Sequence, residues 1–342
     1  MNAGRALAPL QAPYALAIAL KNHAYDHGWL RARELAWPVI SIGNLSVGGA
    51  GKTPVVIALA NLLRARGLPV DVLSRGYGRR SAQAVERVDG AGEARRFGDE
   101  PLLIAQATGV PVYVGASRWA GGILAEADAR SEAGVHLLDD GFGHRRLARS
   151  ADIVVVHPAD IADRLLPAGR LREPLSSLHR ADFLVLREDD AESEAVLRFS
   201  GGRGGMPKPV WRVRRSLNPP AVAGSVVAFC GIAHPGEFFA SLRAHGMDLR
   251  DTLPFRDHHT FSAADIRAIA RRADGAGALL TTEKDFVRLT PAGREQLSRV
   301  APLLPVPLRT EFLDADRCIA TLLDLLAARQ TPPGRPADAM RK

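Results

Sequence analysis

The sequence predicts an α/β protein with a parallel sheet covered by helices and a second, smaller α/β domain. Three observations indicate this fold. A glycine-rich loop separates a strand-like run from a helix-like run, strand-like and helix-like segments alternate along the chain, and residues 199–209 have the glycine- and proline-rich composition of a linker. With 342 residues, of which 46% are hydrophobic, the chain can bury the cores of two domains.

At the N-terminus, residues 6–20 carry no charge and are rich in apolar side chains. The stretch is shorter than the about 20 apolar residues that cross a bilayer. Pro13 is suited to start a helix and Gly28 to end it, so we expect a helix that lies on or dips into a membrane face. A helix that packs on the core of its own domain explains the pattern equally well. A secretory signal peptide explains it less well, because no small-residue cleavage site follows Leu20.

The next element is the loop SVGGAGKTP, which lies between the strand-like residues 39–42 and a helical apolar pattern at 55–66. In that context glycine N–H groups can point at a polyphosphate, and the helix N-terminus adds partial positive charge. We expect Lys52 to reach the β- and γ-phosphates and Thr53 to bind Mg²⁺. The alternative is an ordinary glycine-rich turn, and the usual motif begins with glycine where this chain has Ser46. The predicted nucleotide-binding residues are Ser46, Val47, Gly48, Gly49, Ala50, Gly51, Lys52 and Thr53.

Beyond the loop, the alternating pattern is typical of a P-loop NTPase-like sheet. The segments that alternate in the first part are 70–73, 101–108, 110–114, 118–129, 135–138, 153–156 and 183–186. Those in the second part are 226–229, 236–245, 263–272, 278–281 and 302–307. We therefore divide the chain into a membrane-associated helix (1–34), a P-loop core domain (35–205), a smaller C-terminal α/β domain (206–330) and a tail (331–342).

An acidic pair, Asp139 and Asp140, follows the apolar run at 135–138. A carboxylate at the end of a strand beside a phosphate loop can hold Mg²⁺, or a water bound to it, opposite Thr53. Two aspartates at a strand end are otherwise commonly just a turn. The presence of Lys52 and Thr53 in the same chain favours the metal site.

Asp99 precedes a predicted helix, where an aspartate is most often an N-cap. A second interpretation is a general base. His258 and His259 lie in the segment PFRDHHTF of the second domain. If Asp99 meets one of them across the cleft between the domains, the two form a base and its orienting partner for deprotonating a hydroxyl. The sequence leaves open whether they meet and which histidine takes part.

Two further segments carry charges that phosphate chemistry could use. In AGRLREP, Arg172 can stabilise a transferring phosphoryl group and Glu173 can assist Mg²⁺, although ordinary surface charge explains the segment equally well. The segment TTEKD is similar to the guanine-specifying motif of GTPases, but Lys284 falls one place late. We interpret this similarity as chance, which favours ATP over GTP.

The composition limits the partners. A formal net charge of +8 favours an anionic partner, but the basic residues form no aromatic-interleaved patch, so we expect no nucleic acid. The two cysteines, Cys230 and Cys318, are far apart and lack a histidine cluster. They exclude a disulfide framework and a structural zinc site, and they fit a reducing compartment.

The segments SVGGAGKTP, SRGYGRR, GDEP, DDGFGHRRLAR, AGRLREP, CGIAHP, FRDHHTF and TTEKD, in this order, resemble the tetraacyldisaccharide 4'-kinase family, the lipid A kinases of Gram-negative bacteria. The resemblance extends to about Leu326. It implies ATP- and Mg²⁺-dependent transfer of the γ-phosphate to the 4'-hydroxyl of a tetraacylated glucosamine disaccharide 1-phosphate, an anionic glycolipid. It further implies a peripheral or monotopic enzyme on the cytoplasmic face of the bacterial inner membrane, and no obligate protein partner is evident.

The resemblance also assigns roles by motif. Asp99 matches the catalytic aspartate and His258 its partner, while Ser46 matches the first loop position of the family itself. The predicted catalytic residues are Asp99, His258, Lys52 and Arg172, and the predicted metal ligands are Thr53, Asp139, Asp140 and Glu173. Ser74, Arg75 and Tyr77 fall in the SRGYG segment, which is expected near the acceptor. One position departs from the family, because Gly143 stands where glutamine is usual.

Two other functions remain open at this point. One is a membrane-recruited P-loop ATPase that switches a protein partner, which needs no base for a sugar hydroxyl. Asp99 and His258 separate this function from the kinase. The other is a nonenzymatic basic adaptor with a degenerate loop, which the intact Lys52, Thr53 and acidic pair disfavour.

Overall fold

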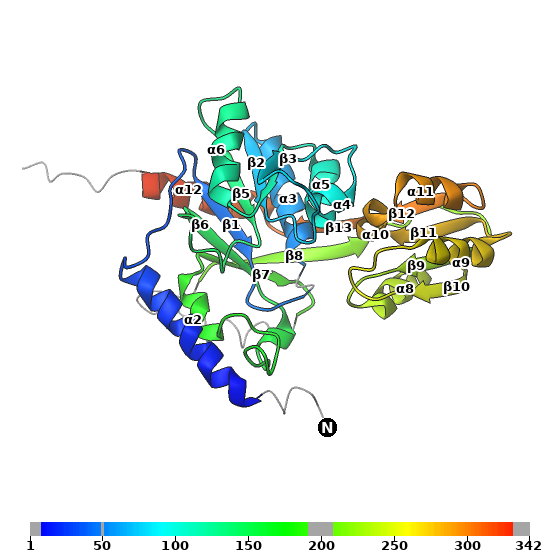
Figure 1. Cartoon of the computed structure of the whole chain (residues 1–342), viewed down its shortest axis with the longest axis horizontal. Helices are drawn as coiled ribbons and strands as arrows, with labels where there is room; N and C mark the ends of the chain where they lie inside the picture. Colours follow the sequence, from blue (N-terminus) through cyan, green and yellow to red (C-terminus); the bar gives the residue numbers. More distant parts are fainter. Residues whose placement is uncertain (1–7, 49–50, 191–207, 331–342) are drawn as a thin grey trace, which may run out of the picture.

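The computed structural model describes residues 8–48, 51–190 and 208–330. A larger domain is built on a nine-stranded sheet and a smaller one on a four-stranded sheet (Figure 1). The strands are β1 (Val39–Gly43), β2 (Val70–Ser74), β3 (Val85–Arg87), β4 (Val112–Gly115), β5 (Val135–Asp139), β6 (Ala151–Val155), β7 (Phe183–Arg187), β8 (Val210–Leu217), β9 (Val226–Cys230), β10 (Leu249–Pro254), β11 (Ala278–Thr282), β12 (Leu303–Val306) and β13 (Leu308–Phe312).

The helices lie between these strands in sequence. The α-helices are α2 (Gln11–Asp26), α3 (Lys52–Ala65), α4 (Ala94–Phe97), α5 (Asp99–Thr108), α6 (Arg118–Asp128), α8 (Pro235–Ala244), α9 (Ala263–Ala273), α10 (Glu283–Arg288), α11 (Pro291–Ser298) and α12 (Ala315–Gln330). Short 3₁₀ turns are η1 (Ala8–Leu10), η2 (Pro158–Asp160) and η3 (Leu175–Arg180). The α/β fold class predicted from the alternation is confirmed.

The large sheet has the strand order β13-β8-β7-β6-β1-β5-β2-β4-β3. Strands β8 to β4 in this order run parallel, and β13 and β3 pair antiparallel at the two edges. The five residues of β1 and of β5 are all buried, as expected for central parallel strands that are covered on both faces. Helices α3, α5 and α12 contribute to the core on one face, whereas α6 and the segment 142–181 cover the other. This arrangement places the carboxyl ends of β1, β5 and β2 side by side.

The smaller domain contains a parallel sheet in the order β10-β9-β11-β12. Phe238, Phe239 and Leu242 of α8 pack on one face of this sheet, while α9 and α11 pack on the other. Helix α10 contacts α5 of the larger domain. The two domains therefore meet where α10 contacts α5, and Arg288 at the end of α10 reaches Asp99 at the start of α5.

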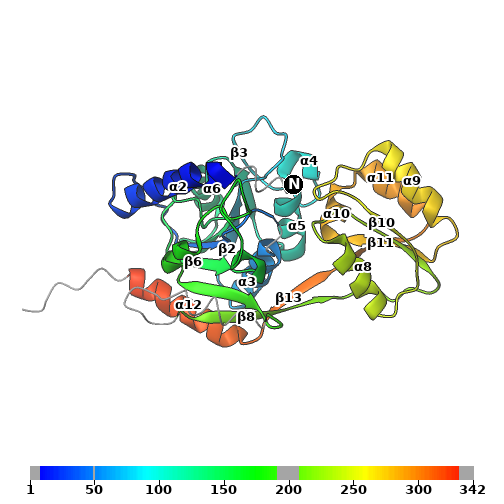
Figure 2. The same cartoon turned by 90° about the horizontal axis from the view of Figure 1, so that it is seen from below.

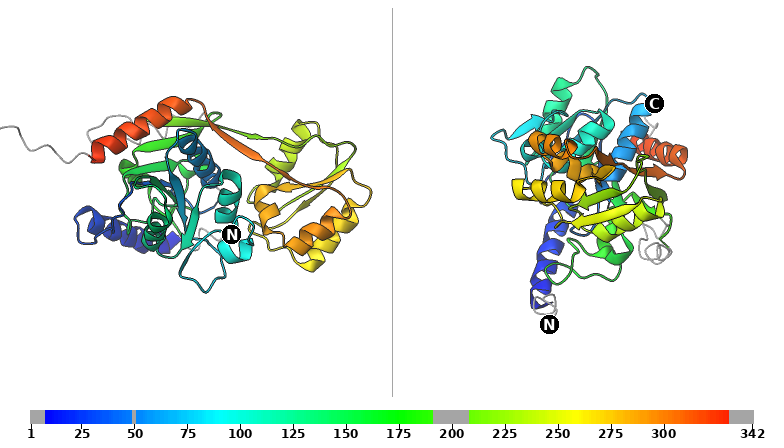
Figure 3. Two further views of the ribbon diagram at one scale, coloured as in Figure 1. Left: turned by 90° about the horizontal axis from the view of Figure 1, so that it is seen from above. Right: turned by 90° about the vertical axis from the view of Figure 1, so that its right-hand side faces the viewer.

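The domain boundary predicted at 205/206 is wrong for part of the chain. Strands β8 and β13 extend the large sheet, and α12 packs against α3 and β6 (Figure 3). Residues 210–217 and 308–330, predicted in the second domain, thus complete the first. The reason is that Trp211 and Val213 of β8 belong to the same buried cluster as α3, although they lie far from it in sequence. The second sheet comprises β9 to β12 only, and the ribbon formed by β8 and β13 joins the domains.

Helix α2 lies at the edge of the larger domain, away from the smaller one (Figure 2). None of its residues is fully buried, although Tyr14, Ala15 and Ile18 are half-buried, so α2 lies on the surface of the domain and adds no side chain to a core. It is held by polar contacts instead: the Tyr14 hydroxyl donates to the carbonyl of Arg172 at 2.9 Å, and Lys21 donates to the carbonyl of Gly143 at 3.0 Å. Within the described ranges, no helix is long and apolar enough to cross a membrane.

Candidate active site

The phosphate loop connects β1 to α3 as the sequence predicts. Gly51 precedes the first turn of α3 with a φ of 79°, and Gly48 has a φ of 104°. Residues other than glycine rarely adopt these backbone angles, so the two glycines explain how the loop can turn sharply into the helix. Ser46 is buried and forms an isolated bridge with Leu171. Gly49 and Ala50, two of the predicted nucleotide-binding residues, lie outside the described residues.

Lys52 and Arg172 converge on one group of oxygen atoms. Lys52 donates to Oδ1 of Asn44 at 2.9 Å and lies 3.5 Å from Oδ1 of Asp140. Arg172 donates to both carboxylate oxygens of Asp140 at 2.7 and 2.8 Å and to Asn44 at 2.6 Å. The structure therefore brings Lys52, Asp140 and Arg172 together, although Arg172 comes from a loop more than 100 residues after Lys52. Asn44 was not predicted, because an asparagine after a strand has no distinctive signal.

Asp140 is held in an unusual state. Its φ is 51°, which is rare for a residue other than glycine and marks a position that its surroundings fix. Burial alone would raise the pKa of its carboxyl, but the hydrogen bond from Arg172 and the charge of Lys52 hold that pKa well below its usual range. Asp140 is therefore ionised, and its charge is shared between two cations.

Asp139 differs from its neighbour. Its side chain is buried, and its Oδ2 accepts a hydrogen bond from the Ser74 hydroxyl at 3.0 Å. Among the described residues, no hydrogen bond reaches its Oδ1. Burial, and then the charges of Glu100 and Asp140, raise the pKa of Asp139 to about 7, against the opposing effects of Lys52 and Ser74. Glu100, the residue after Asp99, was missed as a member of this acidic group.

The residues present are compatible with a Mg²⁺ ion. In the part of the chain that is described, no group of three or more His, Cys, Asp or Glu side chains is arranged to hold a metal. Mg²⁺, however, is commonly bound by one or two carboxylates together with waters and substrate phosphates. Asp139 offers a buried oxygen without a partner at the end of β5, and Thr53 lies in the first turn of α3. A cation would relieve the repulsion that raises the pKa of Asp139.

At the interface between the two domains, Asp99 meets His258 of the smaller domain. Oδ2 of Asp99 lies 3.2 Å from Nδ1 of His258 and accepts hydrogen bonds from Arg288 Nε at 2.8 Å and Nη2 at 2.6 Å. Burial would raise the pKa of Asp99, but the hydrogen bond with His258 and the charges of Arg288 and Lys284 hold it well below its usual range. The N-cap interpretation is wrong, because Gly98 is the N-cap of α5 and Asp99 is its first helical residue.

The structure also separates the two histidines. Nε2 of His259 forms a hydrogen bond with Asp265 at 3.1 Å and its ring stacks on Phe255, so these contacts of His259 lie within the smaller domain. His258 has a φ of 57°, a half-exposed ring and an edge contact with exposed Tyr77, whose ring centroid lies 6.4 Å away. Tyr77 and His258 thus present accessible rings next to Asp99.

Arg288 and Lys284 are site residues that the sequence did not reveal. Arg288 is fixed by Asp285 at 2.9 Å and by the carbonyl of Gly231 at 2.7 Å, and Asp285 is itself fully buried. Lys284 donates to Glu100 at 3.0 Å and lies 3.4 Å from His258 Nε2. Both follow β11 in the TTEKD segment and its helix. The segment looked like a chance match because its partner, α5, is distant in sequence.

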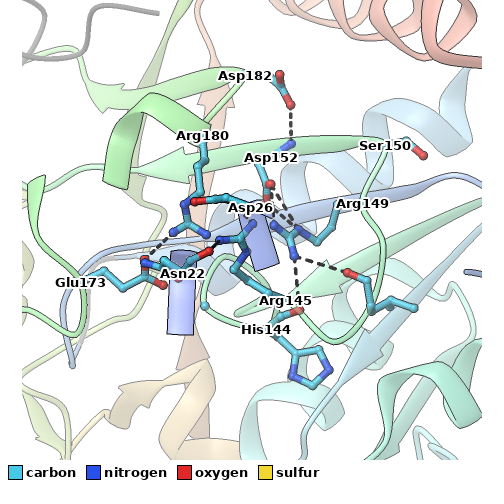
Figure 4. A network of polar contacts seen from close by, with 12 residues as sticks. Asn22, Asp26, His144, Arg145, Arg149, Ser150, Asp152, Glu173, Arg180 and Asp182 are labelled. Atoms are coloured by element: carbon cyan, nitrogen blue, oxygen red, sulfur yellow. Dashed lines mark hydrogen bonds and ion pairs between the residues drawn. The ribbon is translucent and has the colours of Figure 1, made fainter. Parts of the chain in front are cut away.

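Glu173 lies in a different network, which is drawn in Figure 4. It accepts hydrogen bonds from Arg180 and, at 3.1 Å, from Asn22 of α2. Arg145 continues the network to α2 through the carbonyl of Asn22 and the carboxylate of Asp26. The described partners of Glu173 therefore attach α2 to the larger domain, and its predicted role as a metal ligand stays a proposal. A Cβ atom at Gly143 would lie 3.5 Å from Glu173 Oε1, so a longer side chain there would meet this carboxylate.

The fold and this geometry define a class. A phosphate loop at the end of a central parallel strand, an acidic strand end beside it and an aspartate–histidine pair facing it are the parts of a P-loop kinase. The comparisons agree. The family profile described as "Tetraacyldisaccharide-1-P 4'-kinase" matches residues 3–327. The chain is 42% identical to the tetraacyldisaccharide 4'-kinase of Koribacter versatilis over 334 residues, covering 94% of this chain and 99% of the other, and 41% identical to that of Geobacter metallireducens, covering 90% and 94%.

A solved structure is similar as well. The crystal structure of LpxK from Aquifex aeolicus in complex with ATP matches with a TM-score of 0.75 at 30% identity and covers 94% of this chain and 99% of that one. The chain therefore belongs to the tetraacyldisaccharide 4'-kinase family. It is a kinase of lipid A biosynthesis, as its motifs predicted.

Proposed function

We propose that this chain binds ATP with Mg²⁺ on the SVGGAGKTP loop and transfers the γ-phosphate to the 4'-hydroxyl of a tetraacylated glucosamine disaccharide 1-phosphate. The observation that carries the proposal is the contact of Asp99 with His258 at the interface between the domains. A sugar hydroxyl is a weak nucleophile, and a base within reach of it accelerates its attack. An ATPase that only switches a partner has no use for this pair.

Within the pair, His258 is assigned the proton transfer and Asp99 the positioning. A carboxylate that Arg288 keeps ionised is a weak acceptor of protons, so Asp99 is poorly suited to abstract one itself. It is well suited to accept the Nδ1 proton of His258. Nε2, which lies 3.4 Å from Lys284 Nζ, would then take the proton of the acceptor hydroxyl when the substrate replaces Lys284 there. The half-exposed ring of His258 is accessible to a substrate, whereas Asp99 is largely buried.

On the donor side, the chain supplies positive charge where the transferred phosphoryl group carries negative charge. Lys52 and Arg172 are free to exchange Asn44 and Asp140 for phosphate oxygens, because the same donor groups suit both. The residues proposed to hold Mg²⁺ are Thr53, Asp139 and Asp140, with Glu173 as a more distant member. When bound, Mg²⁺ would supply positive charge that stabilises the negative charge of the phosphates.

The proposal includes the cytoplasmic face of the inner membrane as the place of action. The outward side of α2 exposes Leu16 and Leu20, both 60% accessible, and Trp29 follows at 73%. Leu16 and Leu20 lie one turn apart on α2 and Trp29 follows the end of the helix. These side chains can lie in the interface of a membrane that holds the acyl chains of the substrate. The positive charge of the protein favours an anionic lipid face.

The activity is tested with purified protein in detergent micelles, labelled ATP, Mg²⁺ and a tetraacyl disaccharide 1-phosphate. We expect label in the lipid. Label that appears only as free phosphate would overturn the assignment in favour of the switch ATPase.

Membrane contact is tested by flotation with vesicles of phosphatidylethanolamine and phosphatidylglycerol. The double variant Leu16→Asp, Leu20→Asp should float markedly less than the parent. Val300→Asp, which alters an exposed apolar residue of the smaller domain, should float as the parent does. Equal flotation of the α2 variant and the parent would contradict a membrane role for α2.

A further inference from the structure

An arginine outside the known motifs lies against the phosphate loop. Arg215 is on β8, the strand that leaves the large sheet for the smaller domain (Figure 1). A Cβ atom placed on Gly51 would lie 2.9 Å from Nη1 of Arg215 and 3.3 Å from its Cζ. Gly51 is the N-cap of α3, immediately before Lys52. The guanidinium therefore lies beside the end of the loop to which a polyphosphate binds.

The register of β8 explains this position. Side chains alternate along a strand, so Arg215 is on the same face as Trp211 and Val213, which pack in the cluster that includes α3. Strand β7 ends at Arg187, which pairs with Val213, and β8 continues beyond it. Arg215 thus extends the α3-facing row past the carboxyl edge of the sheet. Ligands of open parallel sheets bind at this edge.

The guanidinium has little to hold it in place. Within the described residues, no hydrogen bond or ion pair ends on Arg215, and its Nε is buried without a partner. Thr310, its cross-strand partner on β13, likewise has a buried hydroxyl without a partner. A partly buried arginine without an anion is costly, which indicates that a ligand completes the site.

The charged residues around Arg215 that the structure describes do not supply that anion. Burial, and then the charge of Arg187, lower the pKa of Arg215, and Glu237 and Asp189 oppose this only through space. Asp189 is already paired with Arg187 at 2.6 and 3.0 Å. The neighbouring Arg214 provides a contrast, because it lies on the other face of β8 and is neutralised by Glu188 at 2.6 and 2.8 Å.

We propose that Arg215 binds the phosphate groups of the nucleotide held by the loop. This inference rests on the proposed ATP site and adds a ligand to it. Guanidinium groups bind phosphate oxygens through two N–H donors, which a lysine cannot imitate. Because β8 continues into the smaller domain, a phosphate bound by Arg215 also connects the nucleotide to the strand that joins the two domains.

The test compares Arg215→Gln with Arg214→Gln in full-length protein in detergent micelles. Binding of ATP and of inorganic tripolyphosphate is measured by displacement of a fluorescent ATP analogue in the presence of Mg²⁺. We expect Arg215→Gln to weaken both ligands by about tenfold, the effect of losing one charge-assisted hydrogen bond. Arg215→Lys should recover part of the loss. Arg214→Gln should bind both ligands as the parent does.

Three results would overturn the inference: parental affinity in Arg215→Gln, a loss for ATP without a loss for tripolyphosphate, or an equal loss in Arg214→Gln. If Arg215→Gln melts at a lower temperature than the parent, Arg215→Met replaces it, because methionine keeps the apolar stem and removes the charge. Lys52→Ala separates this inference from the proposed function. If Lys52→Ala and Arg215→Gln both bind ATP with parental affinity, the proposed nucleotide site itself is wrong. If Arg215→Gln keeps parental affinity but Lys52→Ala loses it, the nucleotide site is correct and Arg215 is not part of it.

Discussion

The phosphate loop lies within a single domain, whereas the surroundings of Asp99 are completed by a second domain. Lys52, Asn44 and Asp140 all follow strands of one sheet, and Arg172 reaches them from a loop that hydrogen-bonds to the backbone of Leu45. The domain interface around Asp99 instead depends on α10 and the loop at 256–260 docking against α5.

The two regions also hold their acidic groups differently. In the loop region, the pKa of buried Asp139 is raised to about 7 by burial and by two neighbouring carboxylates. At the domain interface, the pKa of Asp99 is lowered because His258, Arg288 and Lys284 surround it. The loop region is therefore prepared for a cation, and the domain interface keeps an anion that positions a histidine. A site of this kind can bind ATP in one domain and depend on the other for transfer.

The largest expected effect comes from the aspartate–histidine pair at the domain interface. His258→Ala should lower kcat by about 10²–10⁴, the usual contribution of a general base, and leave the KM for ATP nearly unchanged. His259→Ala is the matched control and should stay close to the parent, since His259 bonds Asp265. Steady-state kinetics with the lipid acceptor measure kcat and the KM for ATP in both variants. A large loss in His259→Ala with none in His258→Ala would reverse the assignment.

The phosphate loop should respond with a different kinetic pattern. Lys52→Ala is expected to lower kcat by about 10²–10³ and to raise the KM for ATP as well, because this lysine acts on the phosphates both before and during transfer. The same assay measures both constants. If Lys52→Ala and His258→Ala showed the same pattern, the division of the site into a binding half and a transfer half would be refuted.

The contribution of the contact between the domains can be measured as a change in the free energy of unfolding. Arg288→Gln leaves Asp99 buried without its main partner, which should cost about 3–5 kcal/mol of the free energy of unfolding. The double variant Asp99→Asn, Arg288→Gln removes both charges and should recover much of that loss without recovering activity. Urea denaturation of the two variants and the parent measures this. Additive losses in the double variant would show that the two side chains are not coupled.

The smallest effects are expected from pH, and they have opposite signs in the two regions. Asp99 has a lowered pKa in the folded chain, so its stabilisation is present above the ordinary value of about 3.9 and is lost as the pH falls below it. Asp139 has a raised pKa in the folded chain. In metal-free buffer its contribution to stability is therefore fully present below the ordinary value of about 3.9 and is lost as the pH rises from there toward about 7.

Asp99→Asn should therefore flatten the acid side of the stability profile, and Asp139→Asn should flatten the slope between about pH 4 and pH 7. Denaturation with EDTA present, at several pH values, gives both profiles. An unchanged slope in Asp139→Asn would mean that this carboxyl is ionised in the folded chain throughout the range.

Much of the fold was predictable because its signals are local. The strands β1, β2, β5 and β7 are short apolar runs, and the helices α3, α6 and α9 have clear apolar spacing. Strands β8 and β13 were missed because charged residues interrupt both, and what places them in the large sheet is pairing with each other and with β7. The domain boundary failed for the same reason.

Within the site, the sequence by itself determined the loop, the acidic pair and the family, because each is encoded in a few consecutive residues whose chemistry depends on their spacing. Only the tertiary structure decided that His258 rather than His259 meets Asp99, that Arg288 holds the pair, and that Arg215 lies against Gly51. These contacts join residues that are far apart in the sequence; Asp99 and Arg288, for example, are separated by 189 positions. The packing of two domains brings them together, and no local pattern records that packing.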